Sequence, residues 1–225
     1  MTATPNRTDR KPILKLVDNN LIYQITQREA IERGFLCPFC YYALKDNINY
    51  SNIRHNGFRY YLDDLNRLLI IKRRDQAIIK KYKSLIDGVK AIAFCVSIQH
   101  TIRASNHFND EGIPSVAIHS GLTNEQRKKH IRNFREGKYQ IAFVRDMFNE
   151  GIDFPEVGAL LFLRPTESKI IFTQQLGRGL RIYPGKENVK VLDFIGNFIN
   201  NEKIIDYLGT PDFISDKNNY FSLCL

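Results

Sequence analysis

The second half of the chain alternates short apolar runs with longer amphipathic segments. The short runs cover residues 91–96, 116–118, 140–144, 159–163 and 189–192. A short run that is apolar throughout predicts a strand buried on both faces. Apolar residues at helical spacing fall between these runs, over residues 98–110, 123–137 and 168–181. The alternation predicts an α/β fold with a mostly parallel sheet flanked by helices.

Capping residues mark where several of these helices begin and end. Thr26 precedes Glu29 by three residues, and Thr123 precedes Gln126 by three, which is the pattern of a capping box at a helix start. Glycine supplies the backbone conformation that ends many helices. Three helices are predicted to end at glycines, Gly34, Gly112 and Gly137.

The rest of the chain is less regular and is predicted as a mixed helix and strand extension with a weakly patterned tail. Residues 60–86 carry apolar positions at helical spacing and predict two helices, or one helix with a bend. Aromatic residues favour an extended segment over Phe35–Leu44. The other predicted elements are a strand at 21–25, a short helix from Thr26 to Gly34, and a helix near 202–208.

Positive charge is concentrated in the first part of the chain. The net charge is +9, and residues 1–90 contain 17 Lys and Arg against 9 Asp and Glu, which gives +8. This excess favours a polyanionic partner, with nucleic acid as the natural class. The alternative is a solvated helix face rich in lysine. The densest basic residues are Arg54, Arg59, Lys72, Arg73, Arg74, Lys80, Lys81 and Lys83.

Neither membrane insertion nor a metal centre is predicted. No apolar stretch is long enough to span a bilayer, and the first residues lack the pattern of a signal peptide, so a cytoplasmic protein is expected. Cys37 and Cys40 form one close pair, but Cys95 and Cys224 do not complete a zinc site with it. Cys37 and Cys40 are expected to be reduced thiols on a strand.

Polar residues follow four of the predicted strands. In an open parallel sheet, ligands bind outside the carboxyl ends of the strands. Hydroxyl groups, a glycine and arginines at that edge suit contact with phosphate groups. The alternative is that they are ordinary loop residues. In strand order the candidates are Ser97, then His119, Ser120 and Gly121, then Arg145, and then Thr166.

The predicted helix at 168–181 places Gln174, Arg178 and Arg181 on one face, at positions i, i+4 and i+7. Phe172, Leu176 and Leu180 form an apolar stripe that is expected to face the sheet. The helix also contains two glycines, Gly177 and Gly179, each of which costs about 1 kcal/mol relative to alanine. Close approach of another backbone or of a ligand offsets this cost. The alternative is a solvated basic face.

These segments resemble the motifs of superfamily 2 helicases and translocases, in the right order and spacing. Gln174-x-x-Gly177-Arg178-x-x-Arg181 matches motif VI, residues 149–155 match motif V, and residues 91–97 match motif IV. The resemblance covers residues 90–195 and is to the second RecA-like domain, in the DEAD/DEAH-type group and its XPB-like or restriction-subunit-like branch. It implies a RecA-like three-layer domain that acts on nucleic acid, with DNA favoured over RNA.

The resemblance also implies roles for the candidate residues. Arg178 and Arg181 are expected to be arginine fingers that reach the terminal phosphate of ATP, with Gln174, Gly151 and Asp153 as further nucleotide contacts. Gly177 and Gly179 are expected to permit close approach across the cleft between two domains. Ser97, His119, Ser120, Gly121, Arg145 and Thr166 are expected to contact the sugar-phosphate backbone.

The first residues, Thr2-Ala3-Thr4-Pro5, resemble motif III, in which Thr2 and Thr4 couple the two RecA-like domains. The sequence contains no Gly-x-x-x-x-Gly-Lys-Ser/Thr loop to hold phosphates. We therefore expect a fragment that lacks its first RecA-like domain. ATP and Mg²⁺ act only in the full-length protein, and the chain alone is expected to be inactive. The expected divisions are a remnant of motif III with a linker (1–20), a basic extension (21–89), the RecA-like domain (90–197) and a tail (198–225).

Two other functions fit parts of the same sequence. A non-catalytic nucleic-acid-binding module of the same fold would use the basic region at 54–83 and would not need Arg178 and Arg181. A nucleotide-binding transferase shares the alternating sheet but does not explain the Gln-Gly-Arg-Arg face.

Overall fold

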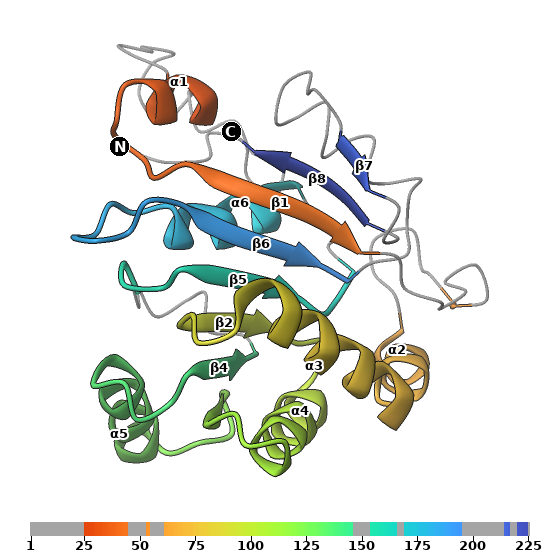
Figure 1. The fold of residues 1–225 in the computed structure, drawn as a ribbon. Helices are drawn as coiled ribbons and strands as arrows, with labels where there is room; N and C mark the ends of the chain where they lie inside the picture. The colour runs from red at the N-terminus through yellow and green to blue at the C-terminus, as the bar shows by residue number, and fades with distance from the viewer. Residues whose placement is uncertain are drawn as a thin grey trace, which may run out of the picture.

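The computed structural model describes residues 25–44, 53–54, 61–145, 154–165, 169–194, 214–216 and 220–224. Within them, one eight-stranded sheet runs in the order β3-β4-β2-β5-β6-β1-β8-β7 (Figure 1). The strands from β3 to β1 in this order pair in parallel, and β8 and β7 continue the sheet through antiparallel pairing. The bounds are β1 Phe39–Leu44, β2 Ala91–Phe94, β3 Ser115–Ile118, β4 Ile141–Val144, β5 Ala159–Phe162, β6 Val189–Asp193, β7 Ile214–Asp216 and β8 Tyr220–Cys224.

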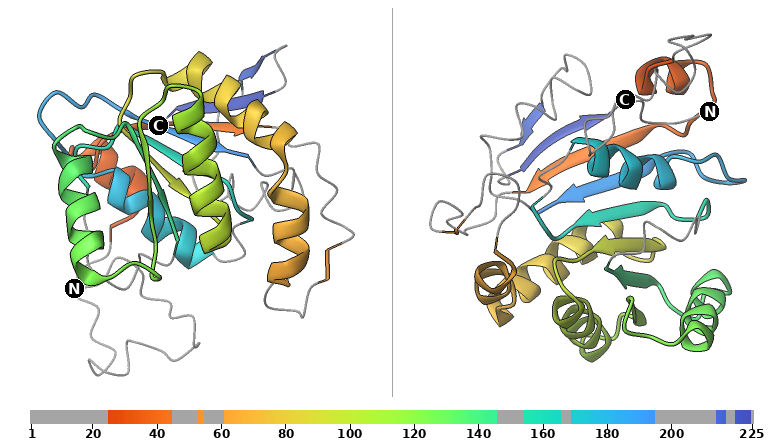
Figure 2. Two further views of the ribbon diagram at one scale, coloured as in Figure 1. Left: turned by 90° about the horizontal axis from the view of Figure 1, so that it is seen from below. Right: turned by 180° about the vertical axis from the view of Figure 1, so that it is seen from behind.

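Helices cover both faces of the sheet, so the domain has three layers. On one face, Tyr82 of α3 stacks edge-on against Phe108 of α4, which in turn contacts Phe143 of β4. On the other face, Phe134 of α5 and Leu176 of α6 belong to a separate apolar cluster. Figure 2 shows α6 against the face that is turned away in Figure 1. The helices are α1 Gln27–Glu32, α2 Leu62–Leu69, α3 Lys72–Ile86, α4 Ile98–Asp110, α5 Asn124–Arg135 and α6 Lys169–Gly179.

This architecture confirms the predicted fold class. All residues of β2, β4 and β5 are buried, as expected for central strands of a parallel sheet. The helix predicted over 98–110 has those bounds, and the region 60–86 forms two helices. Thr123 forms a complete capping box with Gln126. Gly112 and Gly137 follow α4 and α5 with φ of +77° and +80°, which only glycine adopts readily.

One helix boundary was predicted wrongly. Helix α6 ends at Gly179, so Arg181 lies beyond it rather than at position i+7 of its exposed face. The apolar stripe is confirmed, because Phe172, Leu176 and Leu180 are all buried. The strand predicted at 21–25 and the helix predicted near 202–208 fall on residues outside those described, apart from Ile25, which lies in an irregular segment.

The prediction of reduced thiols was wrong for Cys40 and is confirmed for Cys37. Strand β8 lies antiparallel beside β1 and places Cys224 directly opposite Cys40, and these two residues form a disulfide. Cys37 and Cys95 are free and buried. Among the residues with described positions, no group of His, Cys, Asp and Glu is arranged to hold a metal ion. None of the described helices has the length and apolar character that crossing a bilayer requires.

Candidate functional site

Several candidate residues lie together at the carboxyl edge of the sheet. Ser97 follows β2, His119 follows β3 and Arg145 follows β4. The amide of Arg145 donates to the carbonyl of Ile118 at 3.2 Å, which places Arg145 beside His119. A Cβ atom built on Gly121 would lie 3.7 Å from the side chain of Ile98, next to Ser97. The structure therefore brings together the polar residues that follow three neighbouring strands.

Two of these side chains also satisfy local backbone groups. The Ser97 hydroxyl caps α4 by accepting from the amide of His100 at 3.0 Å. Nδ1 of His119 accepts from the amide of Gly121 at 3.2 Å. Burial lowers the pKa of His119, with smaller contributions from the charges of Arg127 and His130. These contacts hold the turn after β3 in shape and leave Ser120 exposed beside it.

The arginines of the predicted motif VI lie toward the opposite edge of the sheet. Strands β5 and β6 are parallel, so α6 runs back between them and ends near the start of β6. The amide of Cys37, just before β1, donates to the carbonyl of Leu180 at 2.7 Å. Arg178 and Arg181 therefore lie near the start of β6 and away from the carboxyl edge. Arg181 and Gln174 are exposed, and Arg178 is half-buried.

The two glycines of α6 have different surroundings. A Cβ atom at position 179 would lie 2.7 Å from Cδ1 of Leu160 and 3.0 Å from its Cγ, whereas a Cβ atom at position 177 would meet nothing within 4 Å. Gly179 thus permits close packing of α6 on β5 of its own sheet. The expected approach across a cleft was the wrong explanation for Gly179, and Gly177 remains available for such a contact.

Sequence reasoning missed Lys186, which lies beside the end of α6. Its ammonium group donates to the carbonyls of Gly179 at 2.8 Å, Pro155 at 2.6 Å and Val157 at 3.3 Å. Gly185, directly before it, has a φ of +79° and turns the chain back toward the helix. The sequence shows the Gly185-Lys186 pair, which is typical of a turn followed by a lysine. That pattern does not reveal which carbonyl groups the ammonium group contacts, so it did not identify Lys186.

In the structure, the basic region at 54–83 exposes fewer cationic side chains than its sequence suggests. Arg74 is buried and donates to the carbonyls of Leu163 and Phe194, both at 3.3 Å, at the carboxyl ends of β5 and β6. Arg74 was therefore wrongly counted as part of a surface patch. Arg54 forms a salt bridge with Asp64 at 2.8 Å.

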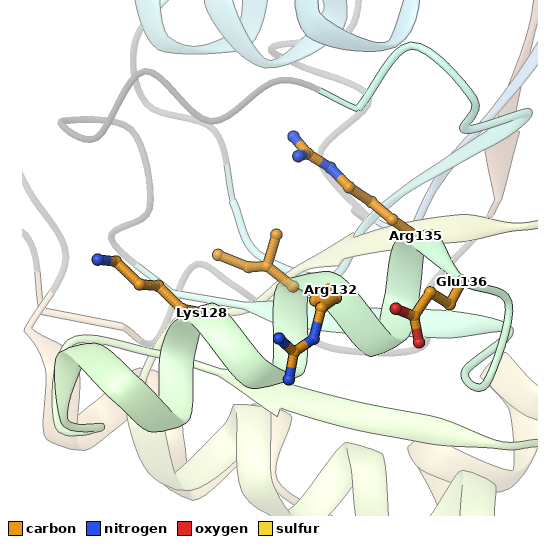
Figure 3. Close-up of a pocket in the computed structure, with 5 residues that line it drawn as sticks. Lys128, Arg132, Arg135 and Glu136 are labelled. Carbon is orange, nitrogen blue, oxygen red and sulfur yellow. The ribbon is translucent and has the colours of Figure 1, made fainter.

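A second basic surface, on α5, surrounds a hollow of about 430 Å³ (Figure 3). Its cationic side chains are Lys128, Arg132 and Arg135, and Glu136 also lines it. Figure 3 shows the charged ends of Lys128 and Arg135 well separated and that of Arg132 pointing in another direction, so the three do not converge on one point. A phosphate site needs convergent donors. This hollow is therefore a charged surface and does not form a phosphate-binding cage.

Five of the candidate residues fall outside the described part of the chain. These are Thr2, Thr4, Gly151, Asp153 and Thr166. Their expected roles remain predictions. The structure resumes at Phe154, whose ring packs against Phe134 of α5 at 5.5 Å between centroids.

Comparison with known proteins agrees with the fold and with the order of the motifs. Residues 74–183 match the family model described as "Helicase conserved C-terminal domain". The Saccharomyces cerevisiae protein "Putative ATP-dependent helicase IRC3" is 28% identical over 198 residues, which cover 87% of this chain and 29% of that protein. A Lactococcus phage 51.5 kDa protein is 26% identical over 220 residues, which cover 98% of this chain and 46% of that protein. The chain thus spans less than half the length of these relatives.

Solved structures share the fold at lower sequence identity. A fragment of "a putative HsdR subunit of a type I restriction enzyme" from Vibrio vulnificus YJ016 superposes with a TM-score of 0.71 and 23% identity, covering 94% of this chain and 42% of that one. The C-terminal domain of the DEAD-box protein Dbp5 superposes with a TM-score of 0.53 and 20% identity, covering 61% of this chain and 80% of that domain.

The fold and the family match together define a helicase C-terminal domain. Residues 74–183 correspond to a helicase C-terminal domain, and the sheet around them has the RecA-like α/β fold.

Proposed function

We propose that this chain supplies the second motor domain of an ATP-dependent helicase or translocase. The supporting observation is the division of its candidate residues between two places. Arg178 and Arg181 lie at the carboxyl-terminal end of α6, whereas Ser97, His119 and Arg145 lie at the carboxyl edge of the sheet. In this proposal the first group meets the nucleotide and the second group meets the nucleic acid.

The chemistry of the arginines supports the nucleotide role. A guanidinium group keeps its charge at all working pH values, and its planar fork meets two phosphate oxygens at once. ATP held between two domains would supply the free energy for movement through its hydrolysis. In this proposal Arg178 and Arg181 provide positive charge from the second domain. The groups that hold the phosphates and Mg²⁺ belong to the first RecA-like domain, because this sequence has no phosphate-binding loop.

The carboxyl edge supports a nucleic-acid role that does not depend on base sequence. Hydroxyl, amide and guanidinium groups near a backbone position a strand but do not read its bases. Closure of the two domains on ATP, followed by reopening, would then move the protein along the strand. We propose DNA as the partner, as the resemblance of the motifs to the restriction-subunit-like branch implies.

A non-catalytic nucleic-acid-binding module is the second candidate, and the exposed cations of α3 favour it. Lys72, Arg73 and Lys80 lie on α3, which packs on the face of the sheet opposite α6. Under this reading, nucleic-acid affinity falls steeply with salt and does not respond to substitution of Arg178 or Arg181.

Reconstitution of the motor tests the leading proposal. The purified chain alone is expected to show no ATP hydrolysis. Addition of a first RecA-like domain that carries a phosphate-binding loop, in trans or as a fusion, is expected to produce hydrolysis that nucleic acid stimulates. A magnesium-dependent ATPase in the chain alone that is abolished by Arg178→Ala contradicts the proposed division of the site.

A further inference from the structure

Lys186 joins two segments that are distant in sequence. Its ammonium group donates to Gly179, the last residue of α6, and also to Pro155 and Val157 in the segment before β5. An ammonium group has three N–H donors and no acceptor, so three carbonyl oxygens match its capacity. Lys186 is half-buried, so the contacts are partly shielded from water.

The two joined segments belong to different parts of the proposed site. Arg178 directly precedes Gly179, and Arg181 follows it by two residues. Pro155 is the last residue of the segment that matches motif V, which starts shortly after Arg145 at the carboxyl edge. Lys186 therefore connects the arginines at the end of α6 with the chain that leads from the nucleic-acid edge.

Two other lysines show what an ordinary lysine cap looks like in this fold. The ammonium of Lys90 donates to the carbonyl of Arg135 at 3.0 Å, at the end of α5. The ammonium of Lys190 donates to the carbonyl of Leu85 at 2.9 Å, in the last turn of α3. A cation at a helix carboxyl terminus is favourable because it meets unpaired carbonyls and the negative end of the helix dipole. Unlike these two contacts, those of Lys186 extend to a second segment.

We propose that Lys186 is a positioning residue that fixes Arg178 and Arg181 relative to the end of the motif V segment. The inference rests on the proposed function for the identity of the arginines, but its structural part concerns this chain alone. Lysine suits the role because its compact charge sits among three carbonyls, whereas the planar guanidinium of arginine cannot direct its donors in the same way. Lys186 does not itself need to touch a nucleotide.

Amide hydrogen exchange on the whole chain tests the structural part. The amide of Leu180 donates to the carbonyl of Leu176 at 3.1 Å in the last turn of α6. Loss of the ammonium group leaves Gly179, Pro155 and Val157 without this donor. In Lys186→Met, exchange at Leu180 is therefore expected to be at least about tenfold faster than in the wild type. Lys190→Met is the matched control and is expected to leave exchange at Leu180 unchanged.

A second variant keeps the test decisive if Lys186→Met folds poorly. Lys186→Arg retains the charge but not the three-way geometry and is expected to shift exchange at Leu180 in the same direction by a smaller factor. Wild-type exchange at Leu180 in either folded variant overturns the inference.

Kinetics of the motor reconstituted with a first RecA-like domain test the functional part. Misplacement of reacting groups by about 1 Å costs on the order of 100-fold in rate. Lys186→Met is therefore expected to lower kcat for nucleic-acid-stimulated hydrolysis by about ten- to a hundredfold. KM for ATP and affinity for nucleic acid are expected to stay within about twofold of Lys190→Met. Equal kcat in the two variants refutes the inference, whereas no activity in the wild-type reconstitution counts against the proposed function instead.

Discussion

A Cβ atom on residue 179 would lie 2.7 Å from Cδ1 of Leu160, so Gly179 marks the point where α6 comes closest to β5. Leu160 is buried in the apolar cluster beneath α5 and α6 and has little room to move away. The glycine thus sets the depth at which the end of α6 sits on the sheet. Arg178 and Lys186 are placed by the same contact, because both adjoin Gly179.

Alanine at the two glycines of α6 should have opposite effects on stability. Gly179→Ala is expected to destabilise the chain by about 1–3 kcal/mol, because the new methyl group overpacks against Leu160. Gly177→Ala is expected to stabilise it by up to about 1 kcal/mol, because the position is open and alanine favours a helix. Urea unfolding of both variants measures the difference. Equal effects of the two substitutions would show that the contact with Leu160 does not limit position 179.

Burial of His100 should make the chain less stable in mild acid. His100 is fully buried, and burial, followed by the charges of Arg74 and Arg103, lowers its pKa from 6.5 to about 3. At pH values between about 3 and 6.5, the unfolded chain therefore binds a proton at His100 that the folded chain does not bind. The resulting stability is present above pH 6.5 and is lost as pH falls toward 3. Between pH 7 and pH 5 this loss amounts to about 2 kcal/mol.

The contribution of His100 can be separated from that of other groups by comparison with His100→Gln. Burial raises the pKa of Asp75, which has the opposite effect on acid stability, so the wild type alone does not isolate the histidine. Urea unfolding at pH 7 and pH 5 is expected to show a smaller acid loss in His100→Gln by about 2 kcal/mol. If the two proteins lose the same unfolding free energy between pH 7 and pH 5, His100 has a pKa near its ordinary value.

Reduction of the disulfide should destabilise the chain substantially. Cys40 and Cys224 are separated by 184 residues, and closing so long a loop restricts the unfolded chain strongly. The chain-entropy estimate for this loop is about 5 kcal/mol, and observed values are commonly about 2–4 kcal/mol. Guanidinium unfolding with and without dithiothreitol measures the effect. Cys37→Ser keeps the disulfide and should still respond to reductant, whereas Cys40→Ser should not. Identical curves with and without reductant would contradict the pairing.

Arg145 should contribute one phosphate contact at the carboxyl edge. Arg145→Ala is expected to weaken binding of the chain to DNA to a similar degree for unrelated sequences, because a phosphate contact carries no base information. The slope of log affinity against log salt should fall by about 1. Fluorescence anisotropy across a salt series measures both quantities. Lys80→Ala, which removes an exposed cation of α3, is the control. A larger effect at Lys80 than at Arg145 would favour the non-catalytic module.

Local patterns predicted much of the fold because its elements are locally encoded. The spacing of apolar residues and the hydroxyl of Ser97 define α4, and Thr123 with Gln126 defines the start of α5. The end of α6 was missed because Leu180 continues the apolar stripe after the helix has stopped. A buried residue that follows a helix has the same pattern as one inside it.

The features that sequence reasoning missed depend on contacts between distant segments. The disulfide requires β8 to lie beside β1, and no local pattern reveals that pairing. The role of Gly179 depends on Leu160, and the role of Lys186 depends on Pro155 and Val157. The resemblance to helicases supplied the roles of Arg178 and Arg181, but it did not predict that they lie away from the carboxyl edge.

The central claim is that Arg178 completes an ATPase site from the second domain. Its most direct test is ATP hydrolysis by this chain joined to a first RecA-like domain, measured with saturating nucleic acid. Arg178→Ala is expected to lower kcat by about 10³-fold or more. Lys128→Ala, which removes an exposed cation of α5, is expected to leave kcat within about twofold. A kcat for Arg178→Ala equal to that of Lys128→Ala would contradict the claim.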